Sequence, residues 1–197
     1  MNLAWLVLIP FLGAAVVAWA GTRGRLWSAY AATAVSFSAL MILLPSVIGV
    51  IEGDVLIWRH EWLPAAGLSI AFRLDGLALL FALMILAIGL LVILYARYYL
   101  SERDPMGRFY AYLLLFQGAM LGIVLSENLI QLLVFWELTS ISSFLLISYW
   151  QHREDARQGA RMALAITGAG GLAMLAGFLM LGEIVGSYEL SVILRSG

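Results

Sequence analysis

The residue best placed for chemistry is an acidic side chain in the middle of an apolar segment. Glu137 lies near the centre of the run 129–149, which is otherwise free of charged residues. A charged side chain at the centre of a bilayer costs about 2.5–3.5 kcal/mol on insertion scales, so such residues usually face a protein interior or a water-filled cavity. Loss of water favours the protonated form of a carboxylate, and a nearby positive charge favours the ionised form. The sequence therefore predicts that Glu137 is a proton relay residue.

The polar neighbours of Glu137 leave a second interpretation open, in which its carboxyl group stays neutral and only supports helix packing. Ser140 lies about one turn further on and is expected to share the face of Glu137, where its hydroxyl group can reach the carboxyl group. Thr139, Ser142 and Ser143 are expected to bond carbonyl groups of their own helix instead. Only a replacement of Glu137 distinguishes the relay from the packing role.

Two amide side chains also lie at membrane depth. Gln117 and Gln131 fall within apolar runs, and each fits either the lining of a hydrated path or ordinary helix packing. No lysine, arginine or histidine lies in the core of any apolar run. Because a relay needs a second site to receive its proton, the sequence predicts that this chain forms part of a proton pathway.

Composition argues against several other kinds of site. The chain has no cysteine, and His60 and His152 lie in separate loops, so we expect no metal site and no cofactor. The formal net charge of -1 provides no basic surface of the kind that binds nucleic acid. Of the 197 residues, 63% are hydrophobic and 12% are charged, whereas soluble domains are about half apolar and about a quarter charged. A lipid bilayer is therefore the expected solvent.

The apolar residues form six runs of the length that crosses a membrane, which is roughly 20 residues. The runs lie at 3–20, 28–51, 76–96, 109–125, 129–149 and 162–182. Backbone polar groups in lipid must be satisfied within their own segment, so each run is predicted to be a helix. The expected fold class is an all-α integral membrane protein with about six transmembrane helices. Residues 1–197 are expected to form one transmembrane region with no separate soluble domain.

The connections between the runs carry local structural signals. Residues 126–128 form the whole connection between two runs, which predicts a tight turn and an antiparallel pair of helices. The outer loop 52–75 contains two short β-prone stretches separated by Pro64 and Gly67, so a small β-hairpin is predicted there. Asp75 is expected to cap the helix that follows.

The last apolar run is rich in glycine and alanine. Ala169, Ala173 and Gly177 recur every four residues and therefore share one face of a helix. Small residues let helices approach closely in a membrane, so this face is predicted to pack against another helix.

The distribution of arginine predicts the orientation, because cytoplasmic loops carry an excess of basic residues. Eight of the eleven arginines lie after the first, third and fifth runs, in the segments 21–27, 97–108 and 150–161. These segments are predicted to be cytoplasmic, and both chain ends are predicted to lie outside. The first run lacks a preceding basic residue, so it is predicted to be an uncleaved helix rather than a signal peptide.

Three stretches of the chain carry a resemblance to a known family. They are FRLDGL at 72–77, LYARYYLSERDP at 94–105 and VFWELTSISSFLL at 134–146. These stretches resemble the start of the A-type subunit of the Mrp multisubunit cation/proton antiporter. The Trp136-Glu137 pair is also similar to the proton-pumping subunit of NADH–quinone oxidoreductase, but the surrounding residues match that protein less well.

The resemblance implies a subunit of a hetero-oligomeric complex in the bacterial inner membrane that exchanges Na+ for H+, with other membrane subunits as partners. It also implies that Glu137 belongs to the proton pathway and is paired with a lysine on a later helix, so that this sequence is the N-terminal part of a longer antiporter-like domain. Such a protein is a secondary transporter rather than an enzyme. Two alternatives remain: a proton-pumping subunit of NADH–quinone oxidoreductase, part of a redox-driven pump, and a structural membrane module without transport of its own.

Overall fold

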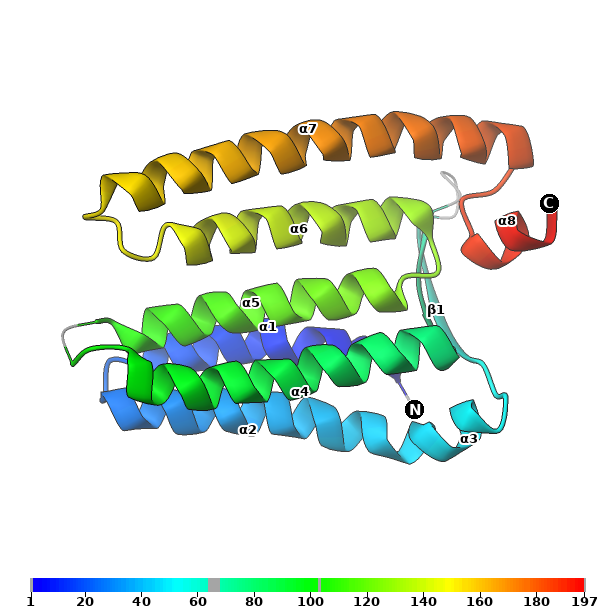
Figure 1. The fold of residues 1–197 in the computed structure, drawn as a ribbon. Helices are drawn as coiled ribbons and strands as arrows, with labels where there is room; N and C mark the ends of the chain where they lie inside the picture. The colour runs from blue at the N-terminus through cyan, green and yellow to red at the C-terminus, as the bar shows by residue number, and fades with distance from the viewer. Residues whose placement is uncertain (1, 64–67, 103, 197) are drawn as a thin grey trace.

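The computed structural model describes residues 2–63, 68–102 and 104–196, and its long helices run side by side in one bundle (Figure 1). Six spans are long and apolar enough to cross a membrane. The helices that supply them are α1 (Leu3–Ala20), α2 (Arg25–Leu43) with its short continuation, α4 (Gly76–Tyr99), α5 (Met106–Leu125), α6 (Leu129–Ile147) and α7 (Glu154–Val185). The predicted all-α membrane fold is confirmed.

The second span differs from the single helix that the sequence predicts. Helix α2 ends at Leu43 and is followed by a 3₁₀ turn, η1 (Leu44–Ser46), and by the short helix α3 (Val47–Ile51). Pro45 lies within that turn. Proline removes a helix hydrogen bond and crowds the preceding turn, which accounts for the interruption of the regular helix.

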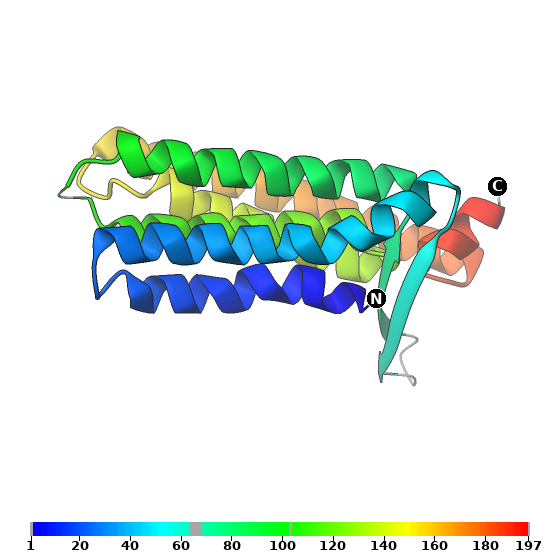
Figure 2. The same cartoon turned by 90° about the horizontal axis from the view of Figure 1, so that it is seen from below.

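A β-hairpin covers one end of the bundle (Figure 2). Strand β1 (Leu56–Leu63) pairs with the antiparallel strand β2 (Leu68–Leu74), which packs on α1, α4 and α5. The predicted hairpin is therefore confirmed. The expected turn residues Pro64 and Gly67 lie outside the described residues.

The connections at the hairpin end are short and capped. Asp75 follows β2 directly, and its carboxylate accepts a hydrogen bond from the backbone N–H of Ala78 at 3.0 Å, as predicted for a helix cap. Residues 126–128 join α5 to α6 in the predicted tight turn. Asn128 caps α6 by accepting hydrogen bonds from two backbone N–H groups of its first turn.

Helix α7 begins well before the predicted run, at Glu154. Glu154 and Asp155 lie in its first turn, where carboxylates interact with the positive end of the helix dipole. The predicted loop 150–161 is therefore mostly helical. The helix ends at Val185 and is capped by Gly186, whose φ of 75° is a left-handed conformation that glycine adopts without strain. A short helix that the sequence did not predict, α8 (Leu190–Ser196), follows it.

Helix α5 is the central helix of the bundle. It packs against α1, α2, α4 and α6, and the side chains of Tyr110, Leu114, Leu121 and Leu125 are fully buried. Helix α7 packs mainly on α6 and lies at the edge of the bundle in Figure 1. Helix α6 therefore lies between a packed core and a single outer helix.

The arginine-rich connections lie together at one end of the bundle, and the hairpin and both chain ends lie at the other end (Figure 1). At the arginine-rich end, the guanidinium group of Arg25 donates to carbonyl groups of the last turn of α4 and of Ser101. The cation is favoured there by the negative end of the helix dipole.

The same end contains a hydrogen-bonded aspartate outside the spans. Asp104 accepts hydrogen bonds from the hydroxyl and backbone N–H groups of Ser101 and from the indole N–H of Trp150. Burial raises the pKa of Asp104, but the hydrogen bonds from Ser101 and Trp150 and the charge of Arg25 together outweigh burial, so the pKa lies below its ordinary value. These contacts connect the loop after α4 to the loop after α6.

Candidate proton-transfer site

Glu137 lies close to the midpoint of the 19-residue helix α6. Its side chain is half-buried and contacts helix α7. Among the described residues, no other acidic or basic side chain lies at a comparable depth in any of the six spans. Glu137, the residue that the sequence singles out, therefore lies between helices α6 and α7.

Gly171 of α7 provides the space that the carboxyl group of Glu137 occupies. It is one of few buried residues in a helix that is otherwise mostly exposed. A Cβ atom added at Gly171 would overlap Oε1 of Glu137 and lie 3.0 Å from its Cδ. Because no side-chain atom tolerates such an overlap, any larger residue at position 171 displaces the carboxyl group. No sequence pattern distinguished this glycine from its neighbours.

The prediction that the small-residue face of α7 packs against another helix is wrong for the described part of the chain. Ala169, Ala173 and Gly177 are exposed, and a Cβ atom added at Gly177 would meet no atom within 4 Å. The buried residues of α7 are instead Ala160, Gly171 and Gly182. A four-residue repeat identifies a face of small residues, but the facing helix decides which side of α7 is covered.

The hydroxyl groups near Glu137 bond their own helix. Ser140 Oγ, which the sequence places within reach of the Glu137 carboxyl group, donates instead to the carbonyl oxygen of Trp136 at 3.3 Å. Thr139 donates to the same carbonyl oxygen at 2.7 Å, and Ser142 also bonds back to its own helix, as predicted. Serine and threonine hydroxyl groups in a helix commonly bond the carbonyl group three or four residues back. Within the described part of the chain, the carboxyl group of Glu137 has neither a hydrogen bond nor an ion pair.

The two amides at membrane depth have packing roles. Gln131 Oε1 accepts from the backbone N–H of Ala71 at 2.8 Å, and its Nε2 donates to the carbonyl oxygen of Ala71 at 3.0 Å, which fixes β2 to α6. Gln117 Oε1 accepts from the hydroxyl group of Ser36 at 2.8 Å, and its Nε2 donates to the carbonyl oxygen of Ile85 at 3.4 Å. Of the two interpretations open at these positions, the bonds favour packing.

Glu127 is a buried carboxylate, although in the sequence it stands out only as part of a turn. Its side chain is fully buried. One carboxylate oxygen lies 3.8 Å from Nη1 of Arg73 on β2, and the other accepts a hydrogen bond from the backbone N–H of Ser191 in α8 at 3.0 Å. A short turn normally faces water, and Glu127 is buried because β2 and α8 fold over the turn. The ion pair links the hairpin to the turn, since an unpaired buried charge is costly, and the hydrogen bond from Ser191 links α8 to the same turn.

Two protein-family models match the chain. The model of the N-terminus of chain 5 of NADH-ubiquinone oxidoreductase (complex I) matches residues 62–110. The transmembrane model of NADH:quinone oxidoreductase/Mrp antiporters matches residues 126–196, which include both Glu137 and Gly171.

Relatives with long matches are antiporter subunits by name. The probable K+/H+ antiporter A/B subunit of Rhizobium meliloti is 53% identical over 194 residues, which are 97% of this chain and 19% of that protein. The Na+/H+ antiporter A-type subunit of Alkalihalophilus pseudofirmus is 50% identical over 145 residues, 73% of this chain and 18% of that protein. A solved Mrp complex from Dietzia sp. matches 98% of this chain and 20% of its own, with a TM-score of 0.84 and 30% identity. The chain belongs to the family of A-type Mrp antiporter subunits.

The fold of the A-type Mrp subunits also occurs in a respiratory assembly. The membrane-bound sulfane sulfur reductase, an archaeal respiratory membrane complex, matches 97% of this chain and 39% of its own with a TM-score of 0.83, but at 20% identity. That likeness shows a shared fold. This Mrp-type chain spans about a fifth of the length of the A-type relatives it matches.

Proposed function

We propose that this chain corresponds to the N-terminal part of the A-type subunit of a multisubunit Na+/H+ antiporter of the bacterial inner membrane. The protein works as a secondary transporter rather than an enzyme, with further membrane subunits as partners. Its relatives by name are antiporter subunits, and the family match includes the membrane glutamate. Glu137 is proposed to carry a proton through one step of the pathway.

The observation that supports this role is the environment of Glu137. The carboxyl group lies at mid-membrane depth between α6 and α7 and has neither a hydrogen bond nor an ion pair within the described part of the chain. A carboxyl group that is permanently neutral and structural is normally hydrogen-bonded when buried. One that exchanges protons must instead be free to meet a donor and an acceptor in turn.

The second candidate is a proton-pumping subunit of the NADH–quinone oxidoreductase type, which the family match at residues 62–110 favours. The two candidates differ in what drives the proton. An antiporter couples its movement to a cation gradient, whereas the pump couples it to electron transfer in partner subunits.

Proton movement in everted vesicles distinguishes the candidates and identifies the cation. Vesicles that contain the complete complex with this chain are acidified by respiration, and a fluorescent dye reports the pH gradient. Added Na+ is expected to dissipate the gradient, and vesicles without the complex serve as the control. A response to K+ but not to Na+ would assign the cation named for the Rhizobium relative. The pump would be favoured if neither cation dissipates the gradient and the complex itself acidifies the vesicles when NADH is oxidised.

The predicted orientation has a direct labelling test. The arginine-rich end is proposed to be cytoplasmic, and Gln151 lies there in an exposed connection, whereas Glu52 is exposed at the opposite end. The chain has no native cysteine, so Gln151→Cys and Glu52→Cys each carry a single thiol. A membrane-impermeant thiol reagent should label position 52 in intact cells and position 151 only after permeabilisation. The reverse pattern would place the arginine-rich end outside.

A further inference from the structure

Helix α7 packs on the rest of the described chain through one face. Its buried residues, Ala160, Gly171 and Gly182, recur every eleven residues, which is about three turns, so they lie in line along the helix. Gly171 faces the carboxyl group of Glu137, and Gly182 faces the ring of Tyr188. Within the described part of the chain, Glu137 has no hydrogen bond or ion pair that could fix the middle contact. The position of Gly171 therefore depends on how the two ends of α7 are held.

At the hairpin end, the chain after α7 folds back over the turn that precedes α6. Residues 188–191, which lead into α8 and form its start, are called the return segment here. The backbone N–H of Leu129 donates to the carbonyl oxygen of Tyr188 at 2.9 Å. The backbone N–H of Leu190 donates to the carbonyl oxygen of Glu127 at 2.7 Å. The return segment therefore joins the end of α7 to the start of α6.

The side chain of Glu127 adds a charged group to this junction. Its Oε1 accepts a hydrogen bond from the backbone N–H of Ser191 at 3.0 Å, and its Oε2 lies 3.8 Å from Nη1 of Arg73. Nε of Arg73 donates to Asp75, the cap of α4, at 3.1 Å. Loss of one partner of a buried ion pair leaves an uncompensated charge, so this arrangement is costly to disrupt. One carboxylate thus connects the return segment to the hairpin and to α4.

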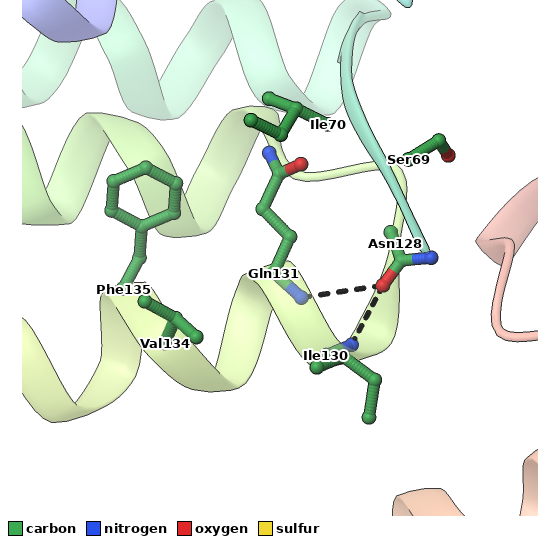
Figure 3. Close-up of a pocket in the computed structure, with 7 residues that line it drawn as sticks. All are labelled: Ser69, Ile70, Asn128, Ile130, Gln131, Val134 and Phe135. Carbon is green, nitrogen blue, oxygen red and sulfur yellow. Dashed lines mark hydrogen bonds between the residues drawn. The ribbon is translucent and has the colours of Figure 1, made fainter. Parts of the chain in front are cut away.

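The start of α6 is only partly packed against the hairpin. A cavity of about 190 Å³ with a mostly apolar lining lies between β2 and the first two turns of α6 (Figure 3). Polar bonds cross from helix to strand beside it: the amide group of Gln131 bonds the backbone of Ala71, and the backbone N–H of Glu127 donates to the carbonyl oxygen of Ala71 at 2.9 Å. Because side chains do not fill the cavity, these bonds are important for the position of the turn and of the return segment bound to it.

We propose that Glu127 is a positioning residue for the Glu137 site. By binding the return segment, Glu127 holds the end of α7 against the start of α6 and so keeps Gly171 in contact with the Glu137 carboxyl group. Without this bond α7 would be held firmly only at its other end, where residues 148–153 connect it to α6. The proposal rests on the proposed role of Glu137 in proton transfer, but the junction itself can be measured independently of transport.

The test compares three variants in the complete complex. Glu127→Gln keeps an acceptor for the return segment but not the charge, and Glu127→Ala removes both. Glu189→Gln is the matched control, because this carboxylate also lies in the return segment and pairs with Arg59 at 2.6 Å. The Arg59 side chain is 44% exposed, and exposed ion pairs contribute little to stability. Hydrogen–deuterium exchange with mass spectrometry reports the N–H groups of Leu190 and Ser191, which are bonded to Glu127.

Deuterium uptake in the return segment is expected to be about fivefold to tenfold faster in Glu127→Gln, since a hydrogen bond to a charged group is stronger than one to a neutral group. It should be faster still in Glu127→Ala and equal to wild type in Glu189→Gln. The first turns of α7, at 154–165, should be equally protected in all variants, because they lie at the other end of the helix.

Cation-driven proton exchange, normalised to assembled complex, is expected to fall in the same order. A loss of about tenfold is expected in Glu127→Ala, since a displacement of about 1 Å at a reacting group can cost up to about 10²-fold. The pH profile should also change, because the surroundings of the Glu137 carboxyl group change with the contact. A purely structural role would instead lower the rate by the same factor at every pH.

Three results would overturn the proposal. The first is faster deuterium uptake in Glu127→Ala with wild-type proton exchange, which would mean that the end of α7 does not position the site. The second is a uniform loss of rate at every pH. The third is loss of proton exchange in Glu127→Gln with a fully protected return segment, which would mean that Glu127 itself transfers protons.

Two further comparisons keep these outcomes distinct. Glu127→Gln decides the matter if Glu127→Ala fails to assemble, because glutamine keeps the volume and an acceptor oxygen. Failure of the proposed function would appear separately, as wild-type proton exchange in Glu137→Gln. The return segment of Glu137→Gln should be protected as in wild type, because Glu137 does not contribute to the junction.

Discussion

Glu137→Gln is expected to abolish cation-driven proton exchange in the assembled complex while leaving the complex intact. Glutamine has nearly the volume and hydrogen-bonding capacity of a protonated glutamate, but it cannot release a proton. Loss of a proton-transfer group typically costs about 10²-fold to 10⁴-fold in rate, so the exchange signal should fall to the background of vesicles without the complex. The measurement is exchange rate against pH, normalised to the amount of complex in the membrane.

The conservative variants separate the relay from a packing role. Glu137→Asp keeps the acid but withdraws it by one methylene group, about 1.5 Å, so partial exchange is expected. Its pH profile should differ from that of wild type. A packing role would give the opposite ranking, with glutamine harmless and aspartate harmful. Exchange by Glu137→Gln close to that of wild type would end the relay proposal.

Much of the architecture follows from the sequence because few backbone structures are stable in lipid. Backbone groups in a bilayer must bond within their own segment, so the apolar runs had to be helices. The hairpin was predictable from its β-prone stretches, and Asp75 from the preference of carboxylates for helix N-termini. Pro45 is visible in the sequence too, but its effect is local, and composition alone does not say whether a proline bends a span or interrupts it.

The parts that the sequence did not reveal depend on which segments meet. Glu127 is buried only because β2 and α8 cover its turn, and no periodicity within residues 126–128 encodes those contacts. Asn128 is a recognisable cap, but no local pattern predicts that its Nδ2 is buried without a hydrogen-bond partner. Contacts between segments distant in the chain are invisible to patterns that extend over a few turns.

The candidate site contains one residue that the sequence identifies, Glu137, and one that only the structure identifies, Gly171. An acid in an apolar helix is conspicuous because of its desolvation cost, so Glu137 is identifiable from one segment. Gly171 is one of several glycines in α7, and only the facing carboxyl group makes it different. The most regular small-residue pattern, at positions 169, 173 and 177, lies on a face that the described part of the chain leaves exposed.

Gly171→Ala is therefore expected to impair exchange without harming assembly. The new methyl group would occupy the place of Oε1 of Glu137, which an added Cβ atom overlaps. The clash is with the flexible end of a side chain, so the carboxyl group rotates away and the helices stay in place. Alanine also favours a helix by about 1 kcal/mol over glycine. Because a displacement of about 1 Å at a reacting group can cost up to about 10²-fold, we expect a tenfold to hundredfold slower exchange, measured per assembled complex as above.

Gly170→Ala is the matched control, since it makes the same chemical change one residue away, where an added Cβ atom meets no atom within 4 Å. Its exchange rate should equal that of wild type. The double variant Glu137→Asp with Gly171→Ala tests the contact itself, because the shorter acid leaves room for the methyl group. If Gly171 acts through the position of the carboxyl group, the double variant should exchange about as fast as Glu137→Asp alone, so that the two losses do not add. Losses that multiply would mean that Gly171 acts independently of Glu137. Equal losses in Gly170→Ala and Gly171→Ala would mean that the glycines act through the conformation of helix α7 and not through the contact with the carboxyl group.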